Sequence, residues 1–336
     1  MAEEEHAIFT TLVGSYPLPD WLRVCPTRQA LVDATRVVLK IQEEAGIDVA
    51  TDGELYRFDV NHPETNGMID YFVGKMEGIT TTFGRKDLAA FRNKTGLSYR
   101  AAPAGVVEGP IGEGTLNLPA DYRMARALTR SKLKFTLTGP HMLSKVLLDR
   151  HYKDRAALAA AIAGVLATQV AHIDADVVQV DEANIPGHPE EGEWAAAAVN
   201  RVLSAVQGEK AVHVCFGNYG GQTVQQGTWD ALVPFLTALR ADHLVLEFKR
   251  WGIEQVACLK DLPETVRIGV GVIDIKDNGV ETPDEIARDV ETAAAHLGPD
   301  RLAYIHPDCG FWMLQRSVAD RKIEALVKGR DLFEGR

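Results

Sequence analysis

The sequence predicts an α/β protein folded as a TIM (β/α)8 barrel. Short runs rich in Val, Ile and Thr alternate with amphipathic helical stretches along the 336 residues, which is typical of parallel strands connected by helices. Polar residues follow the ends of several of these runs, as they do on the carboxyl face of a barrel, where such enzymes keep their active sites. We therefore expect residues 1–336 to form a single catalytic barrel domain.

Nine apolar runs are expected to be strands. They span residues 8–14, 47–52, 104–111, 134–139, 176–181, 211–216, 243–248, 266–272 and 301–306. Because eight parallel strands close a barrel, one of the nine should be accessory. The run 104–111 follows LSYR (97–100) with no helix between them, so we expect it to be the second arm of a β-hairpin within an insertion near residues 75–111.

The helix expected between the first two strands has the clearest boundaries. It runs from about Thr27 to Ala45 and ends at Gly46, a residue type that commonly forms the left-handed C-cap of a helix. Further helices are expected at 154–174, 190–207, 228–240, 282–297 and 313–329.

The charge balance argues against several classes of partner. Lys and Arg total 36 against 47 Asp and Glu, a formal charge of −11, so nucleic acid and anionic membranes are poor partners. No apolar stretch approaches the ~20 residues that cross a bilayer, and MAEEEHAIFT lacks the pattern of a secretory signal. We expect a cytoplasmic protein whose four cysteines, at 25, 215, 258 and 309, are free thiols or metal ligands.

Four residues at the ends of predicted strands have side chains that zinc accepts. His213 and Cys215 lie two residues apart on one strand, so their side chains point to the same face. Glu247 ends the next strand and Cys309 follows the last one. Zinc binds imidazole, thiolate and carboxylate in a tetrahedral shell. A His-x-Cys pair alone is a weak signal, because a buried Cys is often a small apolar filler, so spacing leaves both interpretations open.

Seven short motifs occur in an order that is specific as a set. LVGSYP, TDGE, LTGP, QVDE, VHVC, LEF and HPDCG, spread over residues 12–310, resemble the catalytic barrel of cobalamin-independent methionine synthases, in the short form with one barrel. The resemblance implies that His213, Cys215, Glu247 and Cys309 are zinc ligands.

The resemblance also implies how the amino acid substrate, homocysteine, is held. Ser15 would bind its carboxylate, and Glu54 and Asp181 its ammonium group through charge-assisted hydrogen bonds. From the residues alone, the two carboxylates could instead be N-caps of the helices that follow. Zinc deprotonates a bound thiol and holds the sulfur for attack on an electrophilic carbon, so the implied reaction is thiol alkylation. The resemblance implies that this alkylation is methyl transfer to homocysteine, which forms methionine.

Two departures from the family bear on the methyl donor. The stretch HMLSKVLL, residues 141–148, has Val146 about where the family has a Trp that stacks on the pterin, and Lys276 stands where the family has a His proposed to protonate the folate leaving group. We therefore expect a corrinoid donor, methylcobalamin or a corrinoid protein, rather than a folate. The alternative is a zinc-dependent thiol alkyltransferase with another thiol or electrophile, such as an epoxyalkane:coenzyme M transferase, in which Lys276 is either functional or a solvated surface lysine.

Residues 80–100 have no counterpart in the family. This basic, polar segment is either a lid over the barrel mouth that sets donor specificity or an ordinary surface insertion.

Overall fold

Eight parallel strands form the central sheet of the computed structural model, which describes residues 8–59, 61–62, 65–94, 97, 99–218, 221–298 and 300–336. Their order in the sheet is β1-β11-β10-β9-β8-β7-β5-β2. The strands are β1 (Phe9–Thr10), β2 (Val49–Thr51), β5 (Lys132–Thr138), β7 (Val177–Glu182), β8 (Glu209–Val214), β9 (His243–Leu246), β10 (Arg267–Ile273) and β11 (Leu302–Pro307).

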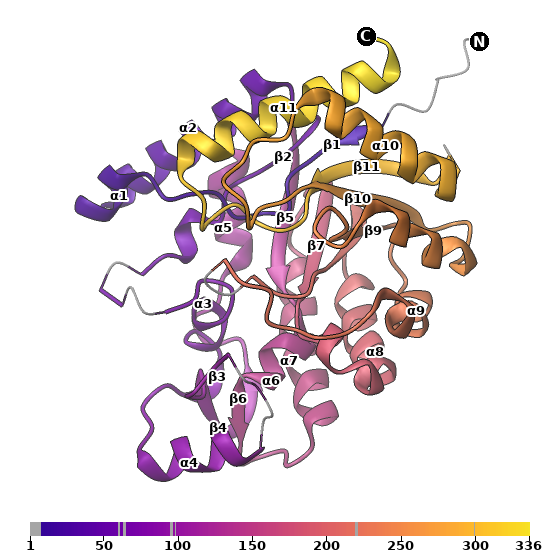
Figure 1. The fold of residues 1–336 in the computed structure, drawn as a ribbon. Coiled ribbons are helices and arrows are strands. Elements are labelled where there is room, and N and C mark those ends of the chain that lie inside the picture. Colours follow the sequence, from indigo (N-terminus) through magenta and orange to yellow (C-terminus); the bar gives the residue numbers. More distant parts are fainter. Residues whose placement is uncertain are drawn as a thin grey trace.

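The two edge strands of this sheet meet and nearly close it into a barrel. Two isolated parallel bridges, Thr11 with Val49 and Ser15 with Gly53, join the segment of β1 to that of β2. Helices cover the outside of the strands, as Figure 1 shows for α2, α7, α8, α10 and α11. The predicted TIM barrel is therefore confirmed, and the carboxyl ends of its strands form one mouth.

The six predicted helices are present. They are α2 (Arg28–Ala45), α7 (Arg155–Val170), α8 (Gly192–Leu203), α9 (Trp229–Ala238), α10 (Pro283–Leu297) and α11 (Arg316–Glu334). The side chain of Thr27 accepts a hydrogen bond from the backbone N–H of Ala30 at the start of α2, and Gly46 ends that helix with φ 87°. A 3-10 helix, η4 (Ile253–Asp261), takes the place of a regular helix between β9 and β10.

Several shorter helices were not predicted. They are α1 (Asp20–Val24), α3 (Asp70–Val73), α4 (Arg85–Lys94), α5 (Leu118–Arg126) and α6 (Pro140–Lys145), and the 3-10 turns η1 (Leu55–Arg57), η2 (Ile185–Gly187) and η3 (Pro189–Glu191). Most of these segments are too short to show a helical period in the sequence.

A small second sheet lies apart from the barrel strands and contains the predicted accessory strand (Figure 1). In it β4 (Gly105–Gly112) pairs antiparallel with β3 (Glu77–Thr80) and parallel with β6 (Leu147–Asp149). The accessory strand is confirmed, but LSYR as its hairpin partner is wrong, because the partner is β3 and α4 lies between the two strands. The strands β3 and β6 were not predicted because they are only four and three residues long, too short to show a strand pattern in the sequence.

No helix in the described part of the chain is long and apolar enough to cross a membrane. The cytoplasmic location stays a prediction.

Candidate functional site

Three of the predicted metal ligands converge at the mouth of the barrel. His213 lies in β8, Cys215 just beyond that strand and Cys309 just beyond β11. The ligand atoms of the three side chains all lie within 4.8 Å of one another, and the three residues are buried. The two-residue spacing on β8 therefore places His213 and Cys215 together, as predicted, and the curvature of the barrel brings Cys309 to them.

The geometry of these three residues fits a tetrahedral zinc ion. The sulfur atoms of Cys215 and Cys309 are 3.7 Å apart, and two sulfurs each about 2.3 Å from a tetrahedral ion would lie about 3.8 Å apart. The Nδ1 atom of His213 donates to the carbonyl oxygen of Val245 at 2.8 Å. In the neutral imidazole this bond places the proton on Nδ1 and leaves the lone pair of Nε2 for a metal, and among the described residues this buried Nε2 atom has no hydrogen-bond partner. Two thiols and an imidazole nitrogen form a donor set that zinc prefers.

The two thiols differ in acidity. The hydrogen bond from Cys215, together with the neighbouring His213, holds the pKa of the Cys309 thiol well below its usual value, although burial acts in the opposite direction. A thiolate is the form that binds metal.

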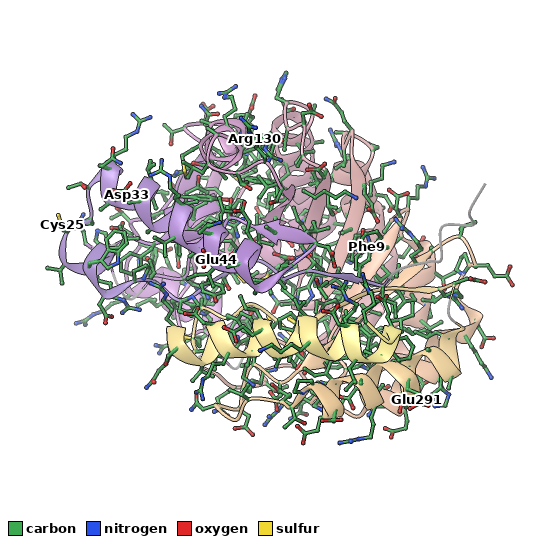
Figure 2. All side chains as sticks on the ribbon, turned by 90° about the horizontal axis from the view of Figure 1, so that it is seen from above. Phe9, Cys25, Asp33, Glu44, Arg130 and Glu291 are labelled. Carbon is green, nitrogen blue, oxygen red and sulfur yellow. The ribbon has the colours of Figure 1, made fainter. Side chains whose placement is uncertain are left out.

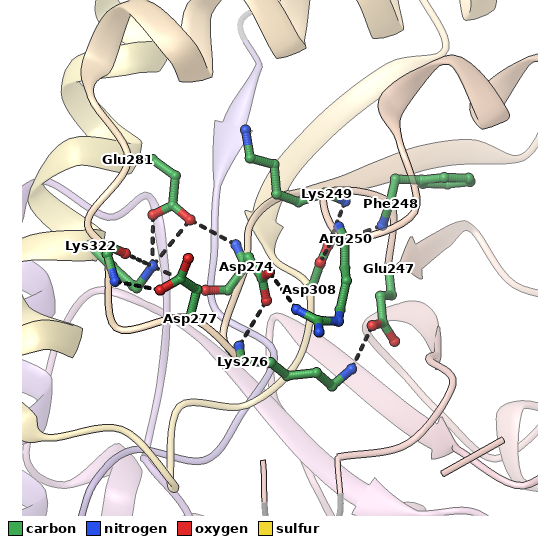
Figure 3. A network of polar contacts seen from close by, with 11 residues as sticks. Glu247, Phe248, Lys249, Arg250, Asp274, Lys276, Asp277, Glu281, Asp308 and Lys322 are labelled. Atoms are coloured by element: carbon green, nitrogen blue, oxygen red, sulfur yellow. Dashed lines mark hydrogen bonds and ion pairs between the residues drawn. The ribbon is translucent and has the colours of Figure 1, made fainter. Parts of the chain in front are cut away.

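Glu247 lies just beyond β9 and its carboxylate is engaged elsewhere. Its Oε1 atom accepts a hydrogen bond from the ammonium group of Lys276 at 2.7 Å, and Oε2 accepts one from the backbone N–H of Phe216 at 2.8 Å. Figure 3 shows the contact with Lys276. Glu247 is thus not part of the group of three ligand atoms, and its role as a fourth ligand stays a prediction.

The carboxylate of Asp308 connects the loop after β9 to the loop that carries Cys309. Its Oδ1 atom accepts from the backbone N–H groups of Phe248 at 3.0 Å and Lys249 at 2.9 Å, and Oδ2 from that of Arg250 at 2.9 Å (Figure 3). A Cβ atom at Gly271 would lie 2.2 Å from Oδ1, so only glycine leaves room for this carboxylate. No role was predicted for Asp308 from the sequence, although its place in the HPDCG motif was a signal.

The predicted substrate residues line the same cavity as the three metal-site residues. Ser15, Glu54 and Asp181 all border it, beside His213, Cys215 and Cys309. Ser15 lies close to the loop after β11, since a Cβ atom at Gly310 would be 2.0 Å from the Ser15 hydroxyl oxygen. The structure therefore brings the three predicted substrate residues and three of the four predicted metal ligands together at one barrel mouth, whereas Glu247 does not line this cavity.

Asp181, in β7, keeps part of its carboxylate available. Its Oδ1 atom accepts a hydrogen bond at 2.7 Å from the side-chain amide of Gln179, which also donates to the carbonyl of Val13 at 2.7 Å. Within the described part of the chain, Oδ2 makes no hydrogen bond. Burial raises the pKa of Asp181 to about 7, and the nearby His213 partly opposes that rise.

Glu54 already has a cationic partner. Its Oε2 atom lies 3.0 Å from a guanidinium nitrogen of Arg57, and the two side chains are 7% and 2% exposed. Its Oε1 atom accepts a hydrogen bond from the hydroxyl of Thr136. Arg57 was not singled out from the sequence, because a charged residue in a loop usually faces solvent.

Neither Glu54 nor Asp181 caps a helix. Glu54 precedes η1 but makes no side-chain capping bond, and Asp181 lies in a strand. The capping role belongs instead to the neighbouring Glu182, whose carboxylate accepts from the backbone N–H groups of His141 and Met142, both at 2.9 Å, at the start of α6. This contact holds the segment that follows the LTGP motif against β7.

The position of Val146, where the family has a Trp that stacks on the pterin, does not form the wall of the cavity. That residue ends α6 and is fully buried in the core. Aromatic side chains reach the cavity from other segments, among them Tyr99 and Trp312. The hydroxyl of Tyr99 donates to the side-chain oxygen of Asn184 at 2.6 Å, which connects this residue of the 80–100 segment to the mouth of the barrel, and the lid interpretation stays a prediction.

The remaining cysteines lie away from the cavity lining. Cys25 is exposed and lies on the outside of the molecule (Figure 2), and Cys258 is half-buried in η4. None of the four cysteines forms a disulfide bond, which agrees with the prediction that they are free thiols or metal ligands.

Comparison with known proteins gives a consistent result. The family model described as "Cobalamin-independent synthase, Catalytic domain" matches residues 8–330. A protein of Sulfurisphaera tokodaii named methionine synthase is 30% identical over 336 residues, which cover 95% of this chain and 90% of that protein. One of Sulfolobus acidocaldarius, with the same name, is 29% identical over 98% of this chain and 93% of its own length.

Two solved structures share the fold. A B12-independent methionine synthase from Shewanella sp. W3-18-1, solved in complex with selenomethionine, has a TM-score of 0.81 at 24% identity, with 98% of each chain covered. A putative vitamin-B12 independent methionine synthase from Listeria monocytogenes has a TM-score of 0.72 at 17% identity, also with 98% of each chain covered.

These matches overturn the prediction of a corrinoid donor or partner. The matching family is one of cobalamin-independent synthases, so Val146 and Lys276 were wrongly taken to exclude a folate. The curated relatives are named methionine synthases, which also leaves the epoxide-opening alternative without support. The physical reason for the error is that the cavity wall is built from Tyr99 and Trp312 as well as from the segment after LTGP.

Proposed function

Because this chain belongs to the family of cobalamin-independent synthase catalytic domains, we propose that it is a zinc-dependent methyltransferase that methylates the thiol of homocysteine to form methionine. One observation carries the proposal. The ligand atoms of His213, Cys215 and Cys309 lie within 4.8 Å of one another in the wall of a cavity that Asp181 also lines.

In this proposal His213, Cys215 and Cys309 hold the zinc ion. When bound, zinc lowers the pKa of the substrate thiol, so that a thiolate is present at neutral pH. The protein fixes the tautomer of His213, because the carbonyl of Val245 can only accept a hydrogen bond and therefore keeps the proton on Nδ1. In the neutral imidazole the Nε2 lone pair would then be free to bind the metal.

Asp181 and Ser15 orient the amino acid part of homocysteine. The Oδ2 atom of Asp181 accepts a hydrogen bond from the substrate ammonium group, and the hydroxyl of Ser15 donates one to the substrate carboxylate. Glu54 contributes less to ammonium binding than Asp181, because its charge is already balanced by Arg57 at 3.0 Å. This arrangement fixes the thiol relative to the metal, and such positioning contributes strongly to catalysis.

The methyl donor in this proposal is a methyltetrahydrofolate. The aromatic rings of Tyr99 and Trp312 offer the flat apolar surface that a pterin ring needs, and both residues line the cavity. Tyr99 is held by its bond to Asn184, so it presents its ring without further ordering.

The test combines the zinc-loaded protein with L-homocysteine and 5-methyltetrahydrofolate, as the monoglutamate and as the triglutamate, and measures methionine. We expect methionine from the unaltered protein and from Cys25→Ser, which changes an exposed thiol, and none from Cys215→Ser. Equal methionine from Cys215→Ser would contradict the metal assignment. Methionine formed only when methylcobalamin replaces the folate would contradict the donor assignment.

A further inference from the structure

We propose that Gln179 is a positioning residue that holds the ammonium acceptor Asp181 and the segment 13–15, which contains Ser15, at the separation that an α-amino acid requires. The proposal rests on the homocysteine methylation proposed above and adds a residue that determines how the amino acid part of the substrate is recognised. It starts from one side-chain amide whose two N–H groups are both used. One donates to Asp181 Oδ1 and the other to the carbonyl oxygen of Val13, each at 2.7 Å.

The orientation of this amide is fixed by its two partners. An ionised carboxylate and a backbone carbonyl can only accept hydrogen bonds, so the nitrogen of Gln179 rather than its oxygen must face both of them. Gln179 is fully buried in β7, and among the described residues its Oε1 atom has no hydrogen-bond partner. The contacts therefore show one role for this amide, which is donation to two acceptors inside the barrel.

The amide joins two strands that are not neighbours in the sheet. Because β2 and β5 lie between β1 and β7, the bond from Gln179 to Val13 crosses the interior of the barrel. Gln179 and Asp181 are two residues apart in β7, which places both side chains on the same face of that strand. Gln179 thus lies one layer farther from the barrel mouth than Asp181 and reaches the segment after β1 from there.

The segment that carries Ser15 is held by three successive carbonyl groups. The first, of Val13, accepts from Gln179. The next two accept from the hydroxyl of Thr51 and from the backbone N–H of Phe311, both at 2.9 Å. Thr51 belongs to β2 and Phe311 follows β11, and both of these strands lie beside β1. Of these three bonds, only the one from Gln179 ties the segment to β7.

The same amide also sets the carboxylate of Asp181. In the part of the chain that the structure describes, Gln179 is the only group that donates a hydrogen bond to this carboxylate. The bond is made to Oδ1 and leaves Oδ2 without a protein partner, beside a cavity that Asp181 and Ser15 both line. In the proposed function, Oδ2 is the atom that accepts from the substrate ammonium group.

This arrangement suits the chemistry of the substrate. An α-amino acid carries its ammonium and carboxylate groups on one carbon atom, so the protein groups that bind them must lie a fixed distance apart. An amide between Asp181 and the segment of Ser15 fixes that distance before the substrate binds, and such preorganisation lowers the cost of binding. Both substrate groups are remote from the reacting sulfur, so their contacts stabilise the ground state and the transition state equally. Loss of Gln179 should therefore raise the KM for homocysteine and leave kcat unchanged.

Steady-state kinetics on the zinc-loaded protein tests the proposal. We expect Gln179→Met, which keeps the size of the side chain and removes the amide, to raise the KM for L-homocysteine about 10–100-fold, because a hydrogen bond to a charged group is lost. The kcat, the KM for 5-methyltetrahydrofolate and the zinc content should stay unchanged. Gln179→Asn keeps an amide but is one methylene shorter and cannot reach both acceptors. It should show the same pattern, and it carries the test if Gln179→Met does not fold.

Two further variants separate positioning from structural support. In the double variant Gln179→Met with Asp181→Asn both changes act on one contact, so we expect a rise in KM well below the product of the two single rises. Gln169→Met is the matched control, because Gln169 is another buried glutamine, accepts from the backbone N–H of Leu118 at 2.9 Å and lies outside the cavity lining. That control should lower the melting temperature and leave the KM for homocysteine unchanged.

The outcomes are distinct. A rise in the KM for homocysteine alone, with effects that do not multiply in the double variant, supports the proposal. The inference is wrong, while the proposed function stands, if Gln179→Met also lowers kcat or zinc content, if it leaves the KM unchanged, if the effects multiply, or if neither Gln179 variant folds. If the unaltered, zinc-loaded protein forms no methionine from homocysteine, the proposed function fails and the inference fails with it.

Discussion

The two halves of the candidate site are built on different principles. The metal half, His213, Cys215 and Cys309, consists of ligand atoms within 4.8 Å of one another, and a backbone carbonyl orients His213. In the substrate half, Ser15, Glu54 and Asp181, the two carboxylates share their charge or hydrogen bonds with other protein groups. Glu54 pairs with Arg57, and Asp181 accepts from Gln179.

The two halves therefore differ in whether a side chain acts alone or together with a protein partner. Removal of a metal-half residue takes away a donor that nothing else in the group supplies. Removal of a substrate-half carboxylate also leaves its protein partner without a counter-charge or an acceptor. The change therefore lowers both the free energy of unfolding and the affinity for substrate.

Replacement of a thiol in the metal half should have the largest effect. We expect Cys309→Ser to lose bound zinc almost completely. Changes to residues that only support the ligands usually lower metal affinity about 10–100-fold, and the loss of a ligand should lower it more. Zinc content per chain, measured by atomic emission on purified protein, checks this. The control is Cys258→Ser, a half-buried thiol outside the site, which should keep its zinc. Equal zinc in both variants would refute the ligand assignment.

Breaking the Glu54–Arg57 pair should be the next largest effect. Glu54→Gln leaves the buried Arg57 guanidinium without its counter-charge, so we expect the free energy of unfolding to fall by about 3–5 kcal/mol. Chemical denaturation measures it. A double variant, Glu54→Gln with Arg57→Met, should recover part of the loss because it removes the unpaired cation. If the single variant is as stable as the parent, the pair does not stabilise the fold.

Removal of the Asp181 charge should act on substrate rather than on the fold. In Asp181→Asn the amide oxygen can still accept the bond from Gln179, whereas the substrate ammonium loses a charged acceptor worth about 1.5–3 kcal/mol. We therefore expect the KM for homocysteine to rise about 10–100-fold with zinc content unchanged. Steady-state kinetics together with metal analysis checks this. An unchanged KM, or a loss of zinc, would argue against Asp181 as the ammonium acceptor.

Much of this site follows from the sequence, and the reason is the period of the strands. His213 and Cys215 share a face because strand side chains alternate, and the ends of β7, β8 and β11 meet because parallel strands of a barrel share one mouth. These relations depend on local spacing and on strand order, and both are visible in the sequence.

The contacts that the sequence did not predict join loops that are distant along the chain. Lys276 meets Glu247, and Asp308 binds the loop after β9, only because the tertiary structure places those loops side by side. The donor prediction failed for the same reason, since Tyr99 reaches the cavity from a segment without a counterpart in the family motifs.

The smallest effect concerns a buried lysine near the substrate half. Lys134, in β5, has an ammonium group without a hydrogen-bond partner in the described part of the chain. Burial lowers the pKa of Lys134 from 10.5 to about 7, although the charge of Asp181 raises it. Between these values the unfolded chain binds a proton that the folded chain lacks, so this group makes stability rise with pH in that window.

Lys134→Met should therefore raise the free energy of unfolding, by at least about 1 kcal/mol below pH 7 and by progressively less toward pH 10.5. Denaturation at several pH values measures this. The control is Lys132→Met, at an exposed lysine of the same strand, which should show no such pH dependence. A gain for Lys134→Met that is the same at every pH would contradict the buried-charge explanation.

In the proposed function, the site formed by His213, Cys215 and Cys309 holds a zinc ion that receives the homocysteine thiol directly. X-ray absorption at the zinc edge on the unaltered protein, without and with L-homocysteine, tests this direct binding by counting sulfur ligands. Two sulfurs are available from Cys215 and Cys309, so we expect a sulfur count of two that rises to three when homocysteine binds. A count that stays at two with the substrate site saturated would show that the thiol does not bind the zinc ion.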